Sequence, residues 1–158
     1  MRLFFALWPP RETALALERW AQALEGRRTP GDNIHLTLAF LGEADAQNAV
    51  SAGRRVQAAP FRLPLEQASY WGHNKIVWAG PGQVPAELTR LVETLQLELY
   101  HEGFMLERRP FAAHVTLVRK APAQSLPPLP RTEWPVEEFA LVGSSGGSYR
   151  TLERFSLG

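Results

Sequence analysis

The chain has no cysteine, no long apolar run and almost no net charge. Without cysteine among its 158 residues, the protein can form neither disulfides nor cysteine-ligated metal centres, which fits a cytoplasmic protein. No stretch approaches the roughly 18 consecutive apolar residues of a membrane-spanning helix, so we expect no membrane association. The apolar start at residues 2–8 is too short for a signal peptide and favours a buried first strand.

The formal net charge of +1 excludes a global basic field of the kind that many duplex-DNA-binding proteins carry. All but two of the 17 basic residues are arginine, which suits phosphate binding, although a general composition bias explains the same count. The arginine pairs at 27–28, 54–55 and 108–109 are better explained as solvated surface than as binding patches. The length and the 45% apolar content favour one domain, with a monomer as the default expectation.

A short motif occurs twice in the chain. Residues 35–38 read His-Leu-Thr-Leu and residues 114–117 read His-Val-Thr-Leu, 79 residues later, which is half of the chain. On a strand, alternate side chains share a face, so the histidine and threonine of each copy point one way and the apolar residues the other. This duplication predicts two matched halves that face one cleft.

The apolar spacing predicts alternating strands and helices. Adjacent hairpins with interspersed helices favour an α+β fold with mainly antiparallel sheets, and the repeated motif favours two lobes. The chain in order predicts a strand at 2–8, a helix at 13–24, a motif strand at 34–41, a helix at 43–59, strands at 61–71 and 75–79, a helix at 85–101, a motif strand at 114–119, and strands at 135–142 and 149–157, with loops at 27–33 and 121–130.

Two histidines can act as a general base and a general acid, because their ordinary pKa near 6.5 allows one to be neutral and the other protonated. In-line displacement at phosphorus needs both roles at once, and Thr37 and Thr116 could hold the non-bridging oxygens. A zinc site is a competing interpretation, but His35 and His114 are too few ligands and have no close carboxylate. We therefore expect no metal and no other cofactor.

The sequence around each motif resembles a known family. Residues 35–43 and 109–119 are similar to the paired motifs of the two-histidine phosphoesterases. Within that superfamily the similarity is greatest to the bacterial and archaeal RNA 2′,3′-cyclic phosphodiesterases, once described as 2′-5′ RNA ligases. The resemblance extends over nearly the whole chain, including residues 2–7, 75–80 and the C-terminal hairpin.

The resemblance implies a bilobal, duplicated α+β architecture with mainly antiparallel sheets lining a central cleft and helices on the outside. Residues 1–158 would form a single domain of two pseudo-symmetric lobes, each contributing one motif. It implies metal-independent hydrolysis of a 2′,3′-cyclic phosphate at an RNA end to a 2′-phosphomonoester. His35 would be the proton donor and His114 the proton acceptor, with Thr37, Thr116 and Arg119 binding the phosphate.

Arg119 matches a basic residue that often ends the second motif, yet strict alternation from His114 places it on the opposite face. It reaches the cleft only if the strand ends or twists there. Two departures from the family pattern are Ala112-Ala113, where a proline is common, and Ser144-Ser145, where an acidic residue often precedes the serine.

Other functions stay open at this point. The same acid and base could run 2′-5′ ligation of RNA halves, and a protein that only binds RNA ends is a further alternative. The expected partner is an RNA end carrying a 2′,3′-cyclic phosphate, with tRNA fragments among the candidates. The five tryptophans are expected in core packing rather than in base stacking, and His73 and His101 are expected to have no catalytic role.

Overall fold

The computed structural model describes residues 1–107 and 109–158. The fold is α+β, and every strand pairing in the described residues is antiparallel, as predicted. The elements are β1 (Arg2–Leu7), α1 (Arg11–Ala21), β2 (Arg27–Arg28), the 3₁₀ turn η1 (Gly31–Asn33), β3 (Leu36–Glu43), α2 (Ala46–Arg55), β4 (Phe61–Leu65), β5 (Gln67–Trp71), β6 (Ile76–Gly80), α3 (Ala86–His101), β7 (Val115–Arg119), β8 (Thr132–Val136), β9 (Glu138–Ser145) and β10 (Ser148–Ser156).

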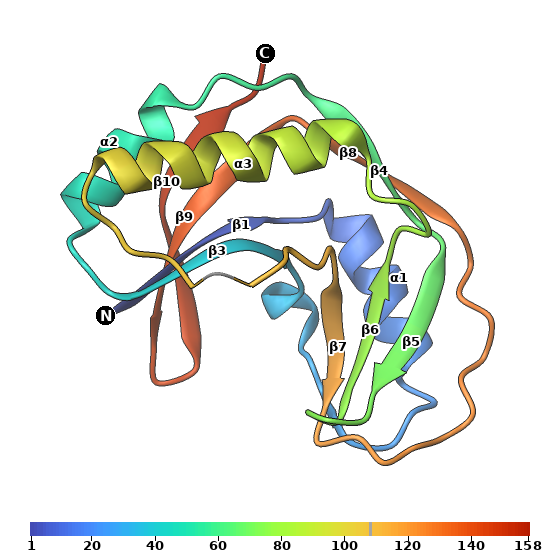
Figure 1. Ribbon diagram of the computed structural model, residues 1–158. Helices are drawn as coiled ribbons and strands as arrows, with labels where there is room; N and C mark the ends of the chain where they lie inside the picture. The colour runs from blue at the N-terminus through green and yellow to red at the C-terminus, as the bar shows by residue number, and fades with distance from the viewer. Residues whose placement is uncertain (108) are drawn as a thin grey trace.

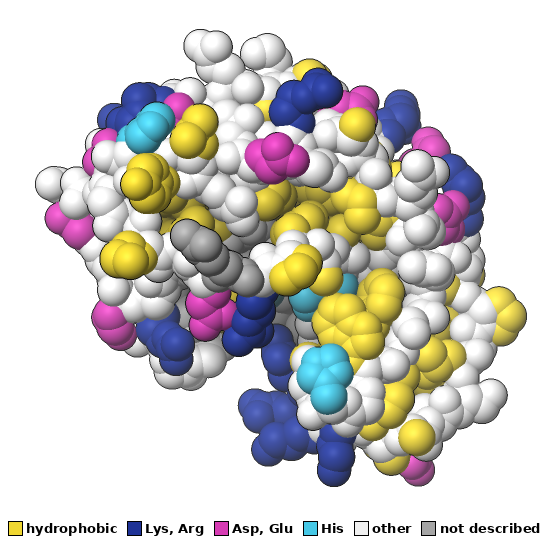
Figure 2. All heavy atoms as spheres, in the orientation of Figure 1, with side chains coloured by type: hydrophobic (Ala, Val, Ile, Leu, Met, Phe, Trp, Pro, Cys, Tyr) yellow, Lys and Arg dark blue, Asp and Glu magenta, His cyan; other side chains and the backbone are white. Residues whose placement is uncertain are grey.

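The main sheet has the strand order β10-β9-β1-β3-β7-β6-β5, with β2 paired to β7. Its two motif strands, β3 and β7, are joined by the single pair Leu36 and Val115, so the sheet divides there into two parts (Figure 1). We call β1, β3, β9 and β10 with helices α2 and α3 the first lobe. The second lobe consists of β2, β5, β6 and β7 with helix α1. Figure 2 shows the surface hollowed between these two parts.

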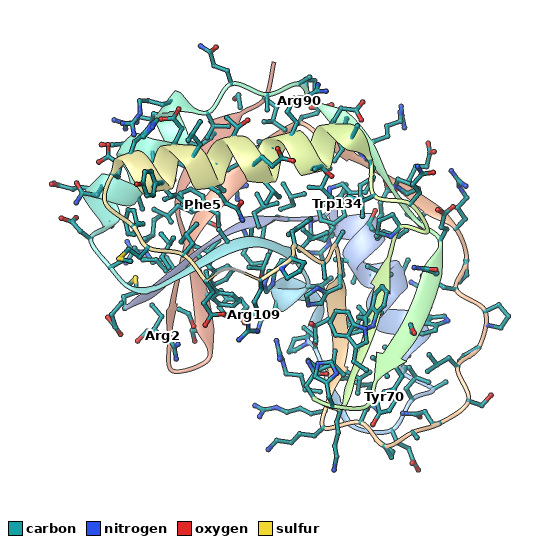
Figure 3. The ribbon with its side chains drawn as sticks, in the orientation of Figure 1. Arg2, Phe5, Tyr70, Arg90, Arg109 and Trp134 are labelled. Atoms are coloured by element: carbon teal, nitrogen blue, oxygen red, sulfur yellow. The ribbon has the colours of Figure 1, made fainter. Side chains whose placement is uncertain are left out.

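The hydrophobic core lies between the helices and the sheet. Helix α3 buries Leu88, Leu91, Val92, Leu95 and Leu99, the apolar positions that predicted it. Figure 3 shows Phe5 and Trp134 on the inner side of this helix. Such burial stabilises the fold by about 1.5–3 kcal/mol for each large side chain.

Strand β1 is buried on both faces. Leu3, Phe5 and Leu7 join the core under the helices. Phe4 and Ala6 point the other way and form a second, smaller cluster on the face away from the helices. The face of the sheet that no helix covers therefore also carries apolar side chains. His35 of the first motif lies on this same face, where its ring contacts Phe4.

The predictions for residues 61–71 and 135–142 are wrong in one respect, because each is two strands rather than one. Strand β4 pairs with β8 in a separate two-stranded sheet, whereas β5 and β9 belong to the main sheet. The chain changes partner at Glu66, whose N–H donates to the Gly80 carbonyl, and at Glu137 between β8 and β9. Both segments stay extended, so local sequence pattern did not reveal the change of sheet.

Helix boundaries differ from the predictions by a few residues for identifiable reasons. Helix α1 begins directly after Pro10 and ends at Ala21, so Gly26, five residues later, does not cap it. Helix α2 begins only at Ala46, because the Asp45 side chain caps it by accepting the Gln47 N–H. Residues 27–33, predicted as a loop, include the short strand β2 and the turn η1.

The arginine pair at 54–55 is solvated surface, as predicted. Arg54 pairs with Glu153 at 3.4 Å and Arg55 with Glu98 at 2.8 Å, on exposed parts of the molecule. Arg108 lies outside the described residues. No described helix is long and apolar enough to cross a membrane.

Candidate active site

His35 and His114 each stand immediately before a motif strand. The next residues, Leu36 and Val115, are fully buried and pair with each other across the two lobes. Extending this antiparallel register by one residue places His35 opposite Thr116 and His114 opposite Thr37. The two histidines and two threonines therefore share one face at the junction of the lobes, while their apolar neighbours anchor the strands in the core.

The two imidazoles are held in the same way. His35 Nδ1 lies 2.7 Å from the Asn33 carbonyl oxygen, and His114 Nδ1 lies 2.9 Å from the Ala112 carbonyl oxygen. A carbonyl only accepts, so Nδ1 carries the proton in both rings and Nε2 remains for proton transfer. His35 Nε2 lies 3.0 Å from the Thr37 hydroxyl. Ala112, in the Ala112-Ala113 pair that departs from the family pattern, supplies the carbonyl that orients His114.

Both histidines have a pKa below the ordinary value of 6.5. Burial is the main cause for each, and it outweighs the backbone hydrogen bond at Nδ1, which favours the charged ring. The positive charge of Arg119 lowers the pKa of both rings further, and that of His114 also lowers the pKa of His35. The site thus favours the neutral form of both imidazoles. A negative charge bound beside them would raise both pKa values again.

Arg119 reaches the histidines because strand β7 contains a bulge. Trp78 pairs with Thr116 but the preceding residue Val77 pairs with Val118, which leaves Leu117 as an extra residue. Leu117 and Val118 are accordingly both buried. The bulge shifts the alternation by one and returns Arg119 to the face of Thr116. Alternation alone therefore misplaced Arg119, and its charge acts on both imidazoles.

Aromatic side chains surround His35. The rings of Phe4, Tyr149 and Trp8 have centroids 5.1, 5.4 and 5.5 Å from that of the imidazole. Trp8 is held by an indole hydrogen bond of 3.2 Å to the Thr151 hydroxyl. Phe4 lies on β1, Trp8 directly follows β1 and Tyr149 lies on β10, and the three rings separate the imidazole from solvent on that side.

His114 has a tryptophan pair beside it. The ring centroids of Trp71 and Trp78 lie 4.7 and 6.5 Å from that of His114, and 4.9 Å from each other. The expectation of core packing is right for the buried Trp134, and Trp8 packs against the smaller apolar cluster of Phe4 and Ala6. It is wrong for Trp71 and Trp78, which are half-buried beside His114. Alternation in β6 could have found Trp78, because its neighbours Val77 and Ala79 face the core.

Comparison with known proteins gives the family. A family model described as LigT like Phosphoesterase matches residues 7–78. The RNA 2′,3′-cyclic phosphodiesterase of Escherichia coli strain K12 is 36% identical, and the match covers 99% of this chain and 96% of that protein. The protein of the same name from Thermus thermophilus is 37% identical, with 99% and 90% covered. The chain belongs to the LigT-like phosphoesterases.

Solved structures agree with this assignment. The structure of E. coli LigT complexed with 3′-AMP superposes on this LigT-like phosphoesterase with a TM-score of 0.88 at 33% identity, covering 99% of this chain and 97% of that one. A Thermus thermophilus structure superposes with a TM-score of 0.81 at 33% identity over 99% and 97% of the two chains. The predicted α+β architecture with mainly antiparallel sheets is confirmed.

The remaining histidines of this LigT-like phosphoesterase lie where the sequence predicted. His73 is exposed in the β5–β6 turn, and His101 ends helix α3 beside Glu98. Within residues 1–107 and 109–158, no three side chains of the metal-binding types come together. Ser144 and Ser145, the second departure from the family pattern, end strand β9 at the hairpin tip.

A substitution at Gly80 tests how closely the second motif is positioned. A Cβ at Gly80 would lie 2.6 Å from the Ala113 carbonyl oxygen and 3.0 Å from the Trp78 ring. The backbone before His114 must then move, so we expect Gly80→Ala to reduce kcat/KM on a cyclic phosphate about 10- to 100-fold and stability by about 1–3 kcal/mol. Gly72→Ala is the control, because its Cβ meets only Tyr70 at 3.9 Å. Equal activity of both variants would show that His114 tolerates the shift.

Proposed function

We propose that this protein hydrolyses 2′,3′-cyclic phosphates at RNA ends and releases 2′-phosphomonoesters. The observation that carries the proposal is the pair of histidines whose Nδ1 atoms donate to backbone carbonyls, with Nε2 left for proton transfer on one shared face. Relatives matched over nearly their full length are named RNA 2′,3′-cyclic phosphodiesterases, and E. coli LigT was solved with 3′-AMP, a phosphorylated nucleoside.

In the proposed reaction, His114 accepts a proton from water through Nε2 while the water oxygen bonds to phosphorus. The bond from phosphorus to the 3′ oxygen breaks on the opposite side, and protonated His35 supplies the proton to that oxygen. The product is a 2′-phosphate and a free 3′ hydroxyl. Each proton transfer is typically worth about 100- to 10,000-fold in rate.

Thr37, Thr116 and Arg119 bind the phosphate in this proposal. The hydroxyls stand opposite the two histidines in the extended register and can donate to the non-bridging oxygens. Arg119 adds a positive charge, and charge-assisted hydrogen bonds to phosphate are about twice as strong as neutral ones. The charge that develops on these oxygens in the transition state is thereby stabilised.

The organisation of the molecule is part of the same proposal. Residues 1–158 form one phosphoesterase domain of two pseudo-symmetric lobes, and each lobe supplies one His-x-Thr motif to the junction at Leu36 and Val115. The protein is a cytoplasmic monomer that acts on RNA ends, tRNA fragments among them.

Product analysis tests the function directly. A short RNA ending in a 2′,3′-cyclic phosphate is incubated with the protein in the presence of a chelator, and the phosphate position is determined. We expect a 2′-phosphate. A 3′-phosphate would keep the acid–base pair but reverse the orientation of the substrate in the cleft, whereas no reaction by folded protein would contradict the function and favour a binding protein.

The lowered pKa values of the histidines predict the pH dependence. Activity of the free enzyme requires His114 neutral and His35 protonated, so kcat/KM falls in acid as His114 gains a proton and in alkali as His35 loses one. Because both pKa values lie below 6.5, we expect a bell-shaped profile with its maximum below about pH 6.5.

The bound phosphate should move this profile. Its negative charge favours both imidazolium forms, so the maximum of kcat is expected at a higher pH than that of kcat/KM. Both profiles should be unchanged by a chelator. A kcat/KM maximum above about pH 6.5, or an activity that a chelator abolishes and a divalent cation restores, would contradict this mechanism.

A further inference from the structure

The helix-free face of the first lobe continues outward from His35 as an aromatic surface. Phe4 contacts the His35 ring and also lies 5.6 Å from the ring of Phe40 on β3. Tyr149 on β10 lies 5.3 Å from Phe4 on its other side. Phe40 is the outermost of these rings and exposes 69% of its surface, which is unusual for a large aromatic side chain.

The strand register places these rings and the first motif on one face. Phe4 pairs with Phe40, and Ala6, two residues along β1, pairs with Thr37. Going outward from Thr37, the face therefore presents Phe40 and then the end of β1. The ring of Phe4 lies between Phe40 and His35 and links Phe40 to the reaction centre.

A positive charge follows the aromatic surface. Arg2 precedes Phe4 by two residues on β1, so it stands on the same face about 7 Å farther from the site. It is exposed, and no carboxylate in the described part of the chain lies within ion-pair distance of it. Its strand partner Glu43 is instead paired with the Met1 amino group at 3.0 Å. Figure 3 shows Arg2 at the lower end of this lobe.

We propose that Phe40, with Arg2 beyond it, binds the nucleotide on the 5′ side of the cyclic phosphate, so that the enzyme prefers single-stranded RNA ends of at least two nucleotides over a cyclic mononucleotide. The inference rests on the proposed function. In-line attack by water at His114 places the ribose on the His35 side, and the strand then continues over the first lobe. An exposed ring stacks on any base, and an arginine neutralises the adjacent phosphate.

The RNA strand could instead run over the second lobe, where Trp71 and Trp78 lie beside His114 and could stack on a base. With His114 activating water, that side must admit the nucleophile and not the RNA strand. The two paths predict opposite responses to substitution of Phe40 and Trp71, which makes the choice testable.

The experiment compares kcat/KM for adenosine 2′,3′-cyclic phosphate with that for a trinucleotide ending in the same group. We expect the wild-type protein to favour the trinucleotide by about tenfold or more, and Phe40→Ala to reduce this ratio by on the order of tenfold, since one base–aromatic stack is lost. Phe40→Trp should retain the ratio. Tyr100→Ala, which removes an aromatic ring of similar exposure (71%) from helix α3, should leave it unchanged.

Salt dependence tests the arginine. Arg2→Gln should reduce the slope of log(kcat/KM) for the trinucleotide against log[salt] by about 0.7, as expected for one phosphate contact to a single strand. Arg90→Gln, on the outer side of α3 (Figure 3), is the control for the same loss of charge.

The ratio within one variant cancels general effects on activity or folding. Equal kcat/KM for the two substrates in the wild type, or a ratio that Phe40→Ala leaves unchanged, overturns the inference while the hydrolytic function stands. If Trp71→Ala removes the preference for the trinucleotide and Phe40→Ala keeps it, the inference is overturned and the RNA strand runs over the second lobe. Absence of hydrolysis of both substrates removes the proposed function and the inference together.

Discussion

His35→Ala and His114→Ala are each expected to lower kcat on a 2′,3′-cyclic phosphate by about 100- to 10,000-fold, the usual contribution of a general acid or base. Each ring offers only Nε2 for proton transfer, because Nδ1 donates to a backbone carbonyl. Steady-state kinetics with the cyclic phosphate and thermal unfolding of each variant measure the two effects separately.

Removing either ring should leave the fold intact, since the strands are anchored by the buried neighbours Leu36 and Val115. The double variant is expected to be little slower than the slower single variant, because the two groups act on one transition state. His101→Ala, at the exposed end of α3, is the matched control and should keep wild-type turnover. Turnover near the wild-type rate in His35→Ala or His114→Ala would refute the proposed acid–base pair.

Arg119→Gln is expected to reduce kcat/KM by about 10- to 100-fold, because a hydrogen bond to a charged group contributes roughly 1.5–3 kcal/mol. It should also change the pH profile. The Arg119 charge lowers the pKa of His35 and His114, so its removal raises both pKa values and moves the whole kcat/KM profile to higher pH. Kinetics from about pH 5 to 9 and NMR titration of the imidazoles measure the loss and the shift.

The shift in pH separates a charge in the cleft from a structural role. Arg119→Lys should keep the profile, since the charge remains, but recover only part of the rate, because an ammonium lacks the bidentate geometry. Arg90→Gln on the outer helix should change neither quantity. Imidazole pKa values that stay the same in Arg119→Gln would place the guanidinium away from the histidines and contradict the effect of the bulge at Leu117.

The candidate site could be predicted from the sequence to the extent that it depends on local alternation. His35 and Thr37 share a face because they are two residues apart on an extended chain, and the same holds for His114 and Thr116. The apolar residues between them face the core for the same reason. The spacing of leucines in α3 predicted a helix equally well, since a helical face is also a property of one segment.

Features that depend on the pairing of two distant segments could not be predicted from alternation or apolar spacing within one segment. Strand β4 pairs with β8, which lies in the last third of the chain, although local pattern joined it to β5. The bulge that turns Arg119 toward the cleft arises from the pairing of β7 with β6. Trp71 and Phe40 follow ordinary strand patterns, and only the packing of strands against each other places Trp71 beside His114 and Phe40 against Phe4.

The sequence by itself determined the chemistry of this protein: two imidazoles, two hydroxyls, and the faces of the strands that carry them. The tertiary structure decided how these groups meet. The pair Leu36 and Val115 joins the two lobes and sets the histidines across from the threonines, and backbone carbonyls select the reactive nitrogen of each ring. The physical reason is that side-chain alternation is fixed within a few residues, whereas register, bulges and burial depend on contacts between segments far apart in the chain.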